Sequence, residues 1–290
     1  MPELPEVETV RAGLSQLIVG KKVIAETHDW PKGFPNAKAD AAQFLLGASI
    51  VAVRRRAKVL IIDLSSQYSL VIHLKMTGQL VFRGVAVRFG AGHPNDSLVG
   101  DLPDKTTRVA LVFDDGSKLF FNDQRKFGWM RLLPTLEVEN LDFFQKVGPE
   151  PLAANFTADD FVARLHRRAK SGIKAVLLDQ TVVAGIGNIY ADESLWAAKI
   201  HPENKVQDVP VSKLHTLYTE LRRILKLSIE KGGSTDHNYV NAEGKRGSYL
   251  SFAKVFRREG QPCPRCGTII IKTKVAGRGT HTCPFCQTFN

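Results

Sequence analysis

The sequence lacks any long apolar run, and no stretch of its 290 residues has the composition of a membrane-spanning helix. Its start, Met1-Pro2-Glu3, also lacks the basic and apolar regions of a secretory signal. Acidic residues are scarce, since 29 Asp and Glu face 40 Lys and Arg for a formal net charge of +11. We therefore expect a soluble cytoplasmic protein with a surface that binds a polyanion. Ribosomal and membrane-surface proteins share this balance, so it indicates nucleic acid only as a class of partner.

Cysteine is absent from the first nine-tenths of the chain. The four cysteines form two Cys-x2-Cys pairs, Cys263 with Cys266 and Cys283 with Cys286, with sixteen residues between the pairs. A disulfide scaffold would instead spread its cysteines through a small secreted domain. Two such pairs on an antiparallel hairpin present four thiolates tetrahedrally, which predicts one structural Zn²⁺ with no open coordination position. Iron and paired disulfides are the alternatives.

The first residues predict an amphipathic helix. Pro5 suits the first helical turn because its missing N–H needs no partner there, and Glu6 and Glu8 favour the positive end of the helix dipole. Apolar residues then recur at three- and four-residue intervals up to Gly20, which describes one buried face. These residues are Val7, Val10, Leu14 and Leu17.

Removal of Met1 would make Pro2 an N-terminal secondary amine. The reference pKa of an α-amino group is roughly 7.7–8.0, so a fraction of this amine is unprotonated near neutral pH. Such an amine can attack a sugar C1′ and form an iminium without a cofactor. The alternative is an ordinary capped helix whose carboxylates, Glu3 among them, merely face water.

The first half of the chain has the pattern of a β-sandwich that carries this helix. Residues 22–82 are expected to be strands, and an Asp-Asp-Gly turn at 114–116 predicts a hairpin. The clearest strands are at 49–53, 59–64, 70–74, 108–113 and 118–122. The polar stretch 83–107 is long for a structureless loop, and we expect a mobile insertion there.

The second half is expected to be helical. Residues 134–150, which are rich in Pro and Gly near their end, predict an interdomain linker. Thr157 is a helix cap before Phe161 and Leu165, which would face a core. Further helices are expected at 174–178, 189–199 and 211–231.

Six motifs in order make the chain resemble the bacterial formamidopyrimidine-DNA glycosylases of the Fpg/endonuclease VIII family, from Met1 to Cys286. Besides the four-cysteine finger, they are Pro2-Glu3-Leu4-Pro5-Glu6-Val7-Glu8, Arg56-Ala57-Lys58, His73-Leu74-Lys75-Met76-Thr77-Gly78, Arg125-Lys126-Phe127-Gly128 and Gly185-Ile186-Gly187-Asn188-Ile189-Tyr190. The resemblance implies an α+β fold, with an N-terminal β-sandwich and flanking helix, a helical helix-two-turns-helix domain and a zinc finger hairpin. The corresponding domains are 1–133, a linker at 134–150, 151–258 with a lesion-capping loop at about 232–249, and 259–290.

The resemblance also implies a function. It predicts a bifunctional DNA glycosylase and AP lyase that excises 8-oxoguanine and formamidopyrimidines from duplex DNA through a Pro2 iminium, with β,δ-elimination. The expected protein is a nucleoid-associated bacterial monomer that binds damaged double-stranded DNA and no membrane. Two alternatives stay open, an endonuclease VIII-like enzyme for oxidised pyrimidines and a non-catalytic zinc-ribbon protein that binds DNA.

Roles for single residues follow from the matched motifs. Pro2 is the expected nucleophile and Glu3 the general acid, while Lys58 and Arg278 would support the eliminations. Without the resemblance, Lys58 could be a charged residue that only prevents pairing at a strand edge, and Arg278 could be a solvated turn residue. Glu6 would either help protonation or only order the N-terminus.

The remaining predicted site residues would contact DNA. Met76 and Phe127 would fill the void left by an extruded nucleotide while Arg125 faces the orphan base, although both apolar residues could be core residues. Some members of the family have an arginine where this chain has Lys126. A lysine can still neutralise a phosphate, but it cannot form the two parallel hydrogen bonds of a guanidinium. The other expected DNA contacts are His73, which could be a core histidine, and Arg108, Lys170 and Asn188, the last in what could be a simple helix–helix turn.

Overall fold

The computed structural model describes residues 2–93, 95–234 and 249–289. These residues form two compact units, each with its own hydrophobic core. The first unit comprises residues 2–145, without 94, and 231–234, and the second comprises 146–230 and 249–289. The chain therefore leaves the first unit after residue 145 and returns to it at residue 231.

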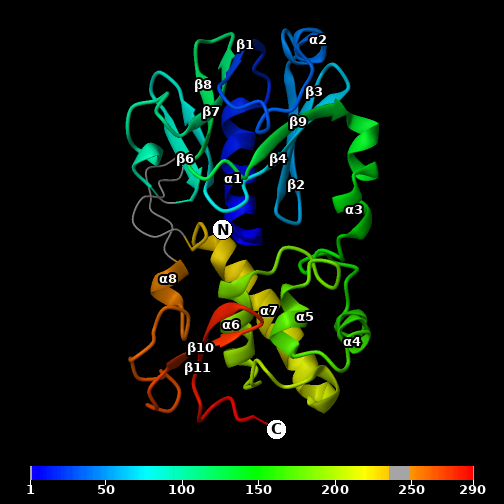
Figure 1. Cartoon of the computed structure of the whole chain (residues 1–290), viewed down its shortest axis with the longest axis vertical. Coiled ribbons are helices and arrows are strands. Elements are labelled where there is room, and N and C mark those ends of the chain that lie inside the picture. Colours follow the sequence, from blue (N-terminus) through cyan, green and yellow to red (C-terminus); the bar gives the residue numbers. More distant parts are fainter. Residues whose placement is uncertain (1, 94, 235–248, 290) are drawn as a thin grey trace. The chain divides into compact units, whose positions relative to one another are not determined.

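The first unit is a sandwich of two antiparallel sheets (Figure 1). The five-stranded sheet has the order β1-β7-β8-β5-β6, with β1 at Val23–His28, β7 at Thr107–Phe113, β8 at Lys118–Asp123, β5 at Gly78–Arg83 and β6 at Arg88–Gly92. The four-stranded sheet has the order β2-β3-β4-β9, with β2 at Ile50–Arg56, β3 at Val59–Leu64, β4 at Tyr68–His73 and β9 at Trp129–Pro134. The predicted sandwich is confirmed.

Helix α1 (Leu4–Ile18) lies between these sheets and contacts β2 and β3 of one and β5 and β6 of the other (Figure 1). Its apolar side chains enter the sandwich core as the three- and four-residue spacing predicts. The fully buried ones are Val7, Val10, Leu14 and Ile18, whereas Leu17 is only partly buried. The helix thus fixes the N-terminus of the chain to both layers of the sandwich.

The segment at residues 83–107, expected to be a mobile insertion, contains regular secondary structure in its described residues. Its first part forms β6, whose Phe89 packs on α1 at Gly13, where a Cβ would lie 2.4 Å from the Phe89 ring. Its second part, which includes a short 3-10 helix (η2, Asp96–Leu98), covers the outer face of the five-stranded sheet. Leu98 there joins a small apolar cluster with Val81, Ala110 and Phe120. The described residues of this segment therefore bury apolar side chains that the sandwich core does not reach.

Two further elements differ from the predicted strands. Residues 38–45, expected to be extended, form α2 (Lys38–Asp40) and a π-helical segment (η1, Ala41–Leu45). Strand β9, which the sequence did not indicate, completes the four-stranded sheet beside β4. The predicted linker contains a 3-10 helix (η3, Thr135–Asn140) and α3 (Asp142–Lys146).

The second unit is helical, as predicted. Thr157 caps α4 (Ala158–His166) through a capping box with Asp160, and Phe161 and Leu165 are buried. Its other helices are α5 (Ile173–Leu178), α6 (Asn188–Ala197), a 3-10 turn (η4, Val206–Asp208), α7 (Val211–Glu230) and α8 (Tyr249–Phe252). The core lies mainly between α4, α5, α6 and α7.

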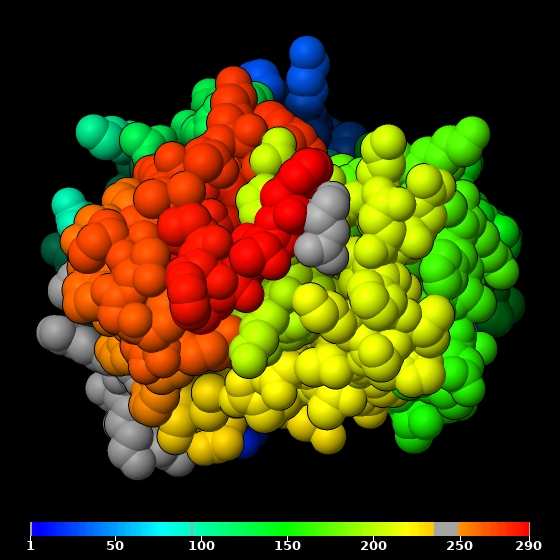
Figure 2. Space-filling model, turned by 90° about the horizontal axis from the view of Figure 1, so that it is seen from below, coloured from blue at the N-terminus to red at the C-terminus, as the bar shows by residue number. Residues whose placement is uncertain are grey.

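A β-hairpin completes the second unit. Strands β10 (Ile271–Val275) and β11 (Arg278–Thr282) are joined by Ala276 and Gly277, whose φ angles of 49° and 74° form a tight turn that matches the strand twist. The C-terminal segment, orange to red in Figure 2, packs directly on the green and yellow helical part. Trp196 of α6 lies in this contact with Cys263 and Cys283.

Candidate active site and metal centre

The N-terminus of α1 is built around two carboxylates. Glu3 is the N-cap residue, and Glu6 completes a capping box with it. Glu6 Oε2 accepts the backbone N–H of Glu3 at 2.8 Å. Pro2, Glu3 and Glu6 are all buried. Because the N–H of Glu3 belongs to the Pro2–Glu3 peptide, Glu6 holds the peptide plane that directs the Pro2 nitrogen.

The second oxygen of Glu6 binds another part of the chain. Glu6 Oε1 accepts the backbone N–H of Ser234 at 2.7 Å. Gly233 precedes it with φ +86°, and a Cβ there would lie 3.1 Å from Glu6 Oε1. Glycine is therefore needed where the returning chain crosses the start of α1. The predicted lesion-capping loop at 232–249 begins here, and most of it lies outside the described residues.

Lys58 lies in the two-residue turn between β2 and β3 and is buried. The preceding Ala57 has φ 52°, a conformation more usual for glycine. Arg55 donates to the Ala57 carbonyl at 2.8 Å and to Glu8 Oε2 of α1 at 2.9 Å. This guanidinium ties the Lys58 turn to the second turn of α1, so the basic run does more than guard a strand edge.

His73 ends β4 and pairs with Val59, the residue after Lys58. Its Nδ1 accepts the backbone N–H of Lys75 at 2.9 Å, which leaves the proton of the neutral ring on Nε2. Burial, together with the nearby charges of Lys75 and Lys58, lowers the pKa of His73 to about 3. At neutral pH His73 is therefore an uncharged donor beside two lysines.

The three predicted void-filling residues occupy two neighbouring turns. Met76 is half-buried in the turn between β4 and β5, and Arg125 and Phe127 are exposed in the loop between β8 and β9. The Arg125 guanidinium lies 4.8 Å from the centre of the Phe127 ring. Phe127 is 51% exposed, which excludes a core role. Lys126, also exposed, lies over the Trp30 ring at 4.6 Å.

Arg108 occupies a different setting from the other predicted DNA contacts. It is buried, and its guanidinium donates to the carbonyl of Asp123 at 2.9 Å, to the carbonyl of Lys105 at 2.7 Å and to Asp29 Oδ2 at 2.5 Å. In this structure Arg108 therefore binds protein oxygens and supports the strand end before the Arg125 loop. Its role as a DNA contact stays a prediction.

In the second unit, Asn188 and Arg278 are brought together. Asn188 begins α6, and its Nδ2 donates to the carbonyl of Gly279 at 2.9 Å, one residue after Arg278. Arg278 is exposed at the start of β11. The amide predicted to bind phosphate thus also fixes the hairpin that presents this guanidinium. Lys170 is exposed in the turn after α4.

A buried ion pair that the sequence analysis missed supports the same hairpin. Lys174 of α5 and Asp192 of α6 are fully buried, with 2.6 Å between Nζ and Oδ1. Lys174 Nζ also donates to Thr280 Oγ1 at 2.6 Å, and Asp192 Oδ2 accepts the backbone N–H of His281 at 2.9 Å. The available signal was a lysine on the apolar side of a short helix. The pair holds β11, and hence Arg278, against the helices.

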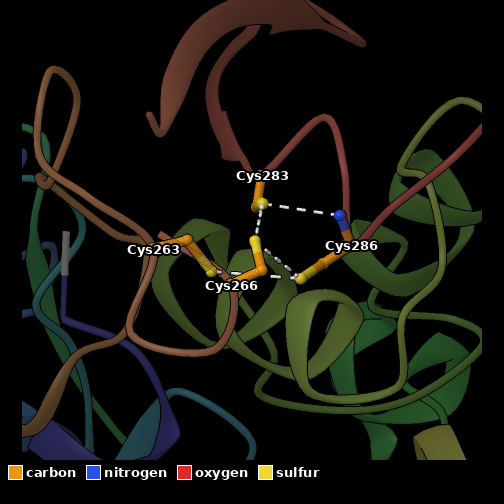
Figure 3. Close-up of side chains that lie close together, drawn as sticks. All are labelled: Cys263, Cys266, Cys283 and Cys286. Carbon is orange, nitrogen blue, oxygen red and sulfur yellow. Dashed lines mark hydrogen bonds between the residues drawn. The ribbon is translucent and has the colours of Figure 1, made fainter. Parts of the chain in front are cut away.

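The four cysteines converge on one point (Figure 3). Their sulfur atoms all lie within 4.8 Å of one another, with Cys266 Sγ 3.4 Å from both Cys283 Sγ and Cys286 Sγ. Four thiolates at about 2.3 Å from a tetrahedral Zn²⁺ are separated by about 3.8 Å, so the arrangement fits this ion. The cysteines are free thiols, which rules out paired disulfides here. They form a structural zinc site, as predicted.

Neighbouring groups shape each half of the zinc site. The N–H of Gly267, at φ +78°, donates to the carbonyl of Cys263 at 2.9 Å and closes the first knuckle. In the second knuckle, Gln287 Oε1 accepts the N–H of Cys283 at 3.0 Å, and its Nε2 donates to the carbonyl of Ile200 at 2.9 Å. Trp196 Nε1 lies 3.4 Å from Cys263 Sγ. These contacts orient the ligands and attach them to α6.

The chain thus combines a β-sandwich that carries an N-terminal helix, a helical part and a four-cysteine zinc finger. Family models agree along the chain: the formamidopyrimidine-DNA glycosylase N-terminal domain matches residues 1–130, and its H2TH domain matches 147–239. The zinc finger found in FPG and IleRS matches residues 260–288.

Whole-length relatives point the same way. The formamidopyrimidine-DNA glycosylase of Herpetosiphon aurantiacus is 42% identical over 99% of this chain and 100% of its own, and that of Streptococcus mutans is 43% identical over 99% of each. A Lactococcus lactis FPG mutant in complex with Fapy-dG DNA superposes with a TM-score of 0.87, at 36% identity over 99% of this chain and 100% of that one. The chain belongs to the formamidopyrimidine-DNA glycosylase family. No described helix is long and apolar enough to cross a membrane.

Proposed function

We propose that this protein excises oxidised purines from duplex DNA and then cleaves the strand, with Pro2 as the nucleophile. The observation that carries the proposal is the N-terminal arrangement, in which Glu6 holds the Pro2–Glu3 peptide at the start of α1. A carboxylate that only capped a solvated helix would not need to be buried. This burial favours a catalytic terminus over the plain helix cap.

The proposed chemistry uses groups of the chain, the DNA and a water molecule for the final hydrolysis. The Pro2 nitrogen attacks C1′, the bond from C1′ to the damaged base breaks, and Glu3 supplies a proton to the sugar ring oxygen or to the leaving base. Opening of the sugar gives an iminium, which withdraws electrons from C2′. Loss of a C2′ proton expels the 3′ phosphate, loss of a C4′ proton then expels the 5′ phosphate, and hydrolysis frees Pro2.

In this proposal each unit, taken by itself, offers donors to DNA phosphates. The neutral His73 offers its Nε2 proton, and Lys58 offers a charge beside it. Arg278 and Lys170 are exposed cations of the second unit, and Asn188 lies next to Arg278 through Gly279. Lys58 and Arg278 stabilise the departing phosphates of the two eliminations.

Duplex DNA must be opened to expose the reacting sugar. Phe127 and Met76 take the space of the extruded nucleotide, while Arg125 offers donors to the orphan base. The exposure of Phe127 and the stacked Arg125 guanidinium support this role. Lys126 neutralises a phosphate.

The lesion class rests on the relatives. Solved neighbours include a Lactococcus lactis FPG mutant with Fapy-dG DNA and a MutM complex with carbocyclic 8-oxo-G DNA, the latter at a TM-score of 0.85 and 37% identity over 99% of this chain and 100% of that one. We therefore propose 8-oxoguanine and formamidopyrimidines as the lesions that this chain excises. We also propose that the protein acts as a monomer on the bacterial nucleoid. We keep the domain limits 1–133, 151–258 and 259–290, with a linker at 134–150 and a lesion-capping loop at about 232–249.

The test is incision of four end-labelled duplexes that carry 8-oxoguanine, a formamidopyrimidine, thymine glycol or no damage. We expect cleavage of the first two, with phosphate at both new ends as β,δ-elimination requires. Preferred cleavage of the thymine glycol duplex would support an oxidised-pyrimidine enzyme instead. Salt-dependent binding without cleavage of any duplex would leave a non-catalytic DNA-binding protein.

A further inference from the structure

The two turns that carry the void-filling residues are joined by one buried hydrogen-bonded pair. Thr77 follows Met76 in the turn between β4 and β5, and Asp123 ends β8 just before the Arg125 loop. The two residues are 46 positions apart in the sequence, and their side chains hydrogen-bond through Thr77 Oγ1 and Asp123 Oδ1. Thr77 is 7% exposed and Asp123 1%.

The pair binds both ends of the Arg125 loop. Thr77 Oγ1 accepts the backbone N–H of Arg125 at 3.0 Å, and Asp123 Oδ1 accepts the same N–H at 3.2 Å. Asp123 Oδ2 accepts the backbone N–H of Gly128 at 2.6 Å, just beyond Phe127. One carboxylate and one hydroxyl therefore close the loop from residue 124 to residue 127 and attach it to the neighbouring turn.

Close backbone packing leaves the pair little freedom. A Cβ at Gly128 would lie 2.7 Å from the Phe121 ring and 3.0 Å from the carbonyl of His73, and a Cβ at Gly78 would lie 2.3 Å from the carbonyl of Leu74. Both turns thus require glycine at one edge. Arg108 supports the pair from behind, since its Nε donates to the carbonyl of Asp123 at 2.9 Å.

We propose that Thr77 and Asp123 are positioning residues that hold Met76 and the Arg125–Phe127 loop as one rigid unit, so that filling the void and reading the orphan base occur together. This inference rests on the proposed function, because it concerns how the enzyme opens damaged DNA. A rigid inserted element is needed because a displacement of about 1 Å can cost about a hundredfold in rate.

The main test variant is Thr77→Val, which keeps the shape of the side chain and removes the hydroxyl. Thr77→Ser restores the hydroxyl, and Thr135→Val is the matched control because it removes a threonine hydroxyl that hydrogen-bonds to Ser69 at 2.9 Å, away from the Arg125 loop. The readouts are single-turnover excision of 8-oxoguanine opposite C and opposite A, and borohydride trapping on an abasic single strand. The trapping substrate has no duplex void to fill.

We expect Thr77→Val to slow duplex excision about tenfold to a hundredfold and to bring the C-to-A rate ratio close to one. Trapping on the single strand should stay at the wild-type level, and Thr77→Ser and Thr135→Val should behave like the wild type. An unchanged ratio and rate in Thr77→Val would overturn the inference. Equal loss of duplex excision and single-strand trapping would also overturn it, since that result indicates general damage to the fold.

A binding cycle separates this inference from the proposed function. Thr77→Val, Phe127→Ala and the double variant are compared for affinity to a duplex with a stable abasic analogue, which needs no catalysis. If the pair positions Phe127, the second substitution adds little to the loss caused by the first. Independent, additive losses would overturn the positioning role. A wild type that binds but never excises would overturn only the proposed function.

Discussion

Glu6 accepts the backbone N–H of Glu3 at 2.8 Å, so a side chain in the first turn of α1 also holds the peptide next to Pro2. The same carboxylate accepts the N–H of Ser234 at 2.7 Å, where the chain returns to the first unit. Both oxygens of Glu6 therefore act as acceptors for main-chain donors. This geometry favours an ordering role for Glu6 over proton transfer to the substrate.

Glu6→Gln tests this role, because glutamine keeps the size but replaces one acceptor oxygen by a donor that faces an N–H. We expect single-turnover excision to fall about tenfold to a hundredfold by the same factor at every pH. Glu26→Gln, on β1 beside His28, is the control and should leave the rate unchanged. A loss confined to one limb of the pH–rate profile would show instead that Glu6 transfers a proton.

His73 should make the folded protein sensitive to acid. Burial and the charges of Lys75 and Lys58 lower its pKa to about 3 in the folded state, so between about pH 6.5 and pH 3 only the unfolded chain takes up this proton. The free energy of unfolding should therefore fall as the pH drops below about 6.5. His73→Asn, whose side-chain oxygen can still accept the Lys75 N–H, should show a shallower fall in urea titrations from pH 7.5 to 4.5.

The free energy of unfolding of His73→Asn should still fall somewhat with decreasing pH, because burial also lowers the pKa values of His93 and His201. Identical slopes in the wild type and His73→Asn would contradict the assignment of a neutral, buried His73.

Lys174→Met should destabilise the second unit strongly, since it leaves the Asp192 carboxylate buried without its cation. The expected loss is about 3–5 kcal/mol in the free energy of unfolding, measured by denaturant titration. Lys170→Met is the matched control at an exposed lysine and should change stability by at most about 0.5 kcal/mol. Lys170→Met should instead make the plot of log affinity for DNA against log salt concentration shallower by about one unit of slope. Equal stability of the two variants would argue against the buried ion pair.

Removal of zinc should abolish DNA binding while the first unit stays folded. Chelation removes the ion and Cys266→Ser removes one of its four ligands, so the two knuckles that flank β10 and β11 are no longer held together. Zinc content, gel-shift affinity and limited proteolysis would be measured together. We expect cleavage confined to the finger and a resistant N-terminal fragment. Unchanged affinity of the metal-free protein would contradict this prediction.

Local signals in the sequence were sufficient for several elements. The spacing of Val7, Val10 and Leu14 predicted α1, the turn at 114–116 predicted the hairpin of β7 and β8, and the four cysteines predicted the zinc site. Strand β6 was missed although it pairs with the neighbouring β5, because its five residues Arg88–Gly92 include two glycines, which are depleted in strands. Strand β9 was missed because its partner β4 is distant in the sequence. A strand whose stability depends on such pairing has a weak local signature.

The site residues show the same division. Motif spacing indicated Pro2, Glu3 and the cysteines, but it could not show that Glu6 binds Ser234 or that Lys174 pairs with Asp192. Glu6 and Ser234 are 228 positions apart, and Lys174 and Asp192, 18 positions apart, lie on two different helices. Only the fold brings either pair within hydrogen-bond distance. Arg108 was predicted to contact DNA because an arginine can bind phosphate. The neighbouring residues in the sequence did not indicate that its side chain is buried.

The most direct test of the central claim is borohydride trapping on an 8-oxoguanine duplex, followed by mass spectrometry of the cross-linked peptide. We expect reduction to fix the DNA sugar to the nitrogen of Pro2 in protein that has lost Met1. A variant with one extra residue before Pro2 should give no cross-link while it still binds the duplex. A cross-link on any other residue, or undiminished trapping by the extended protein, would contradict the assignment of Pro2 as the nucleophile.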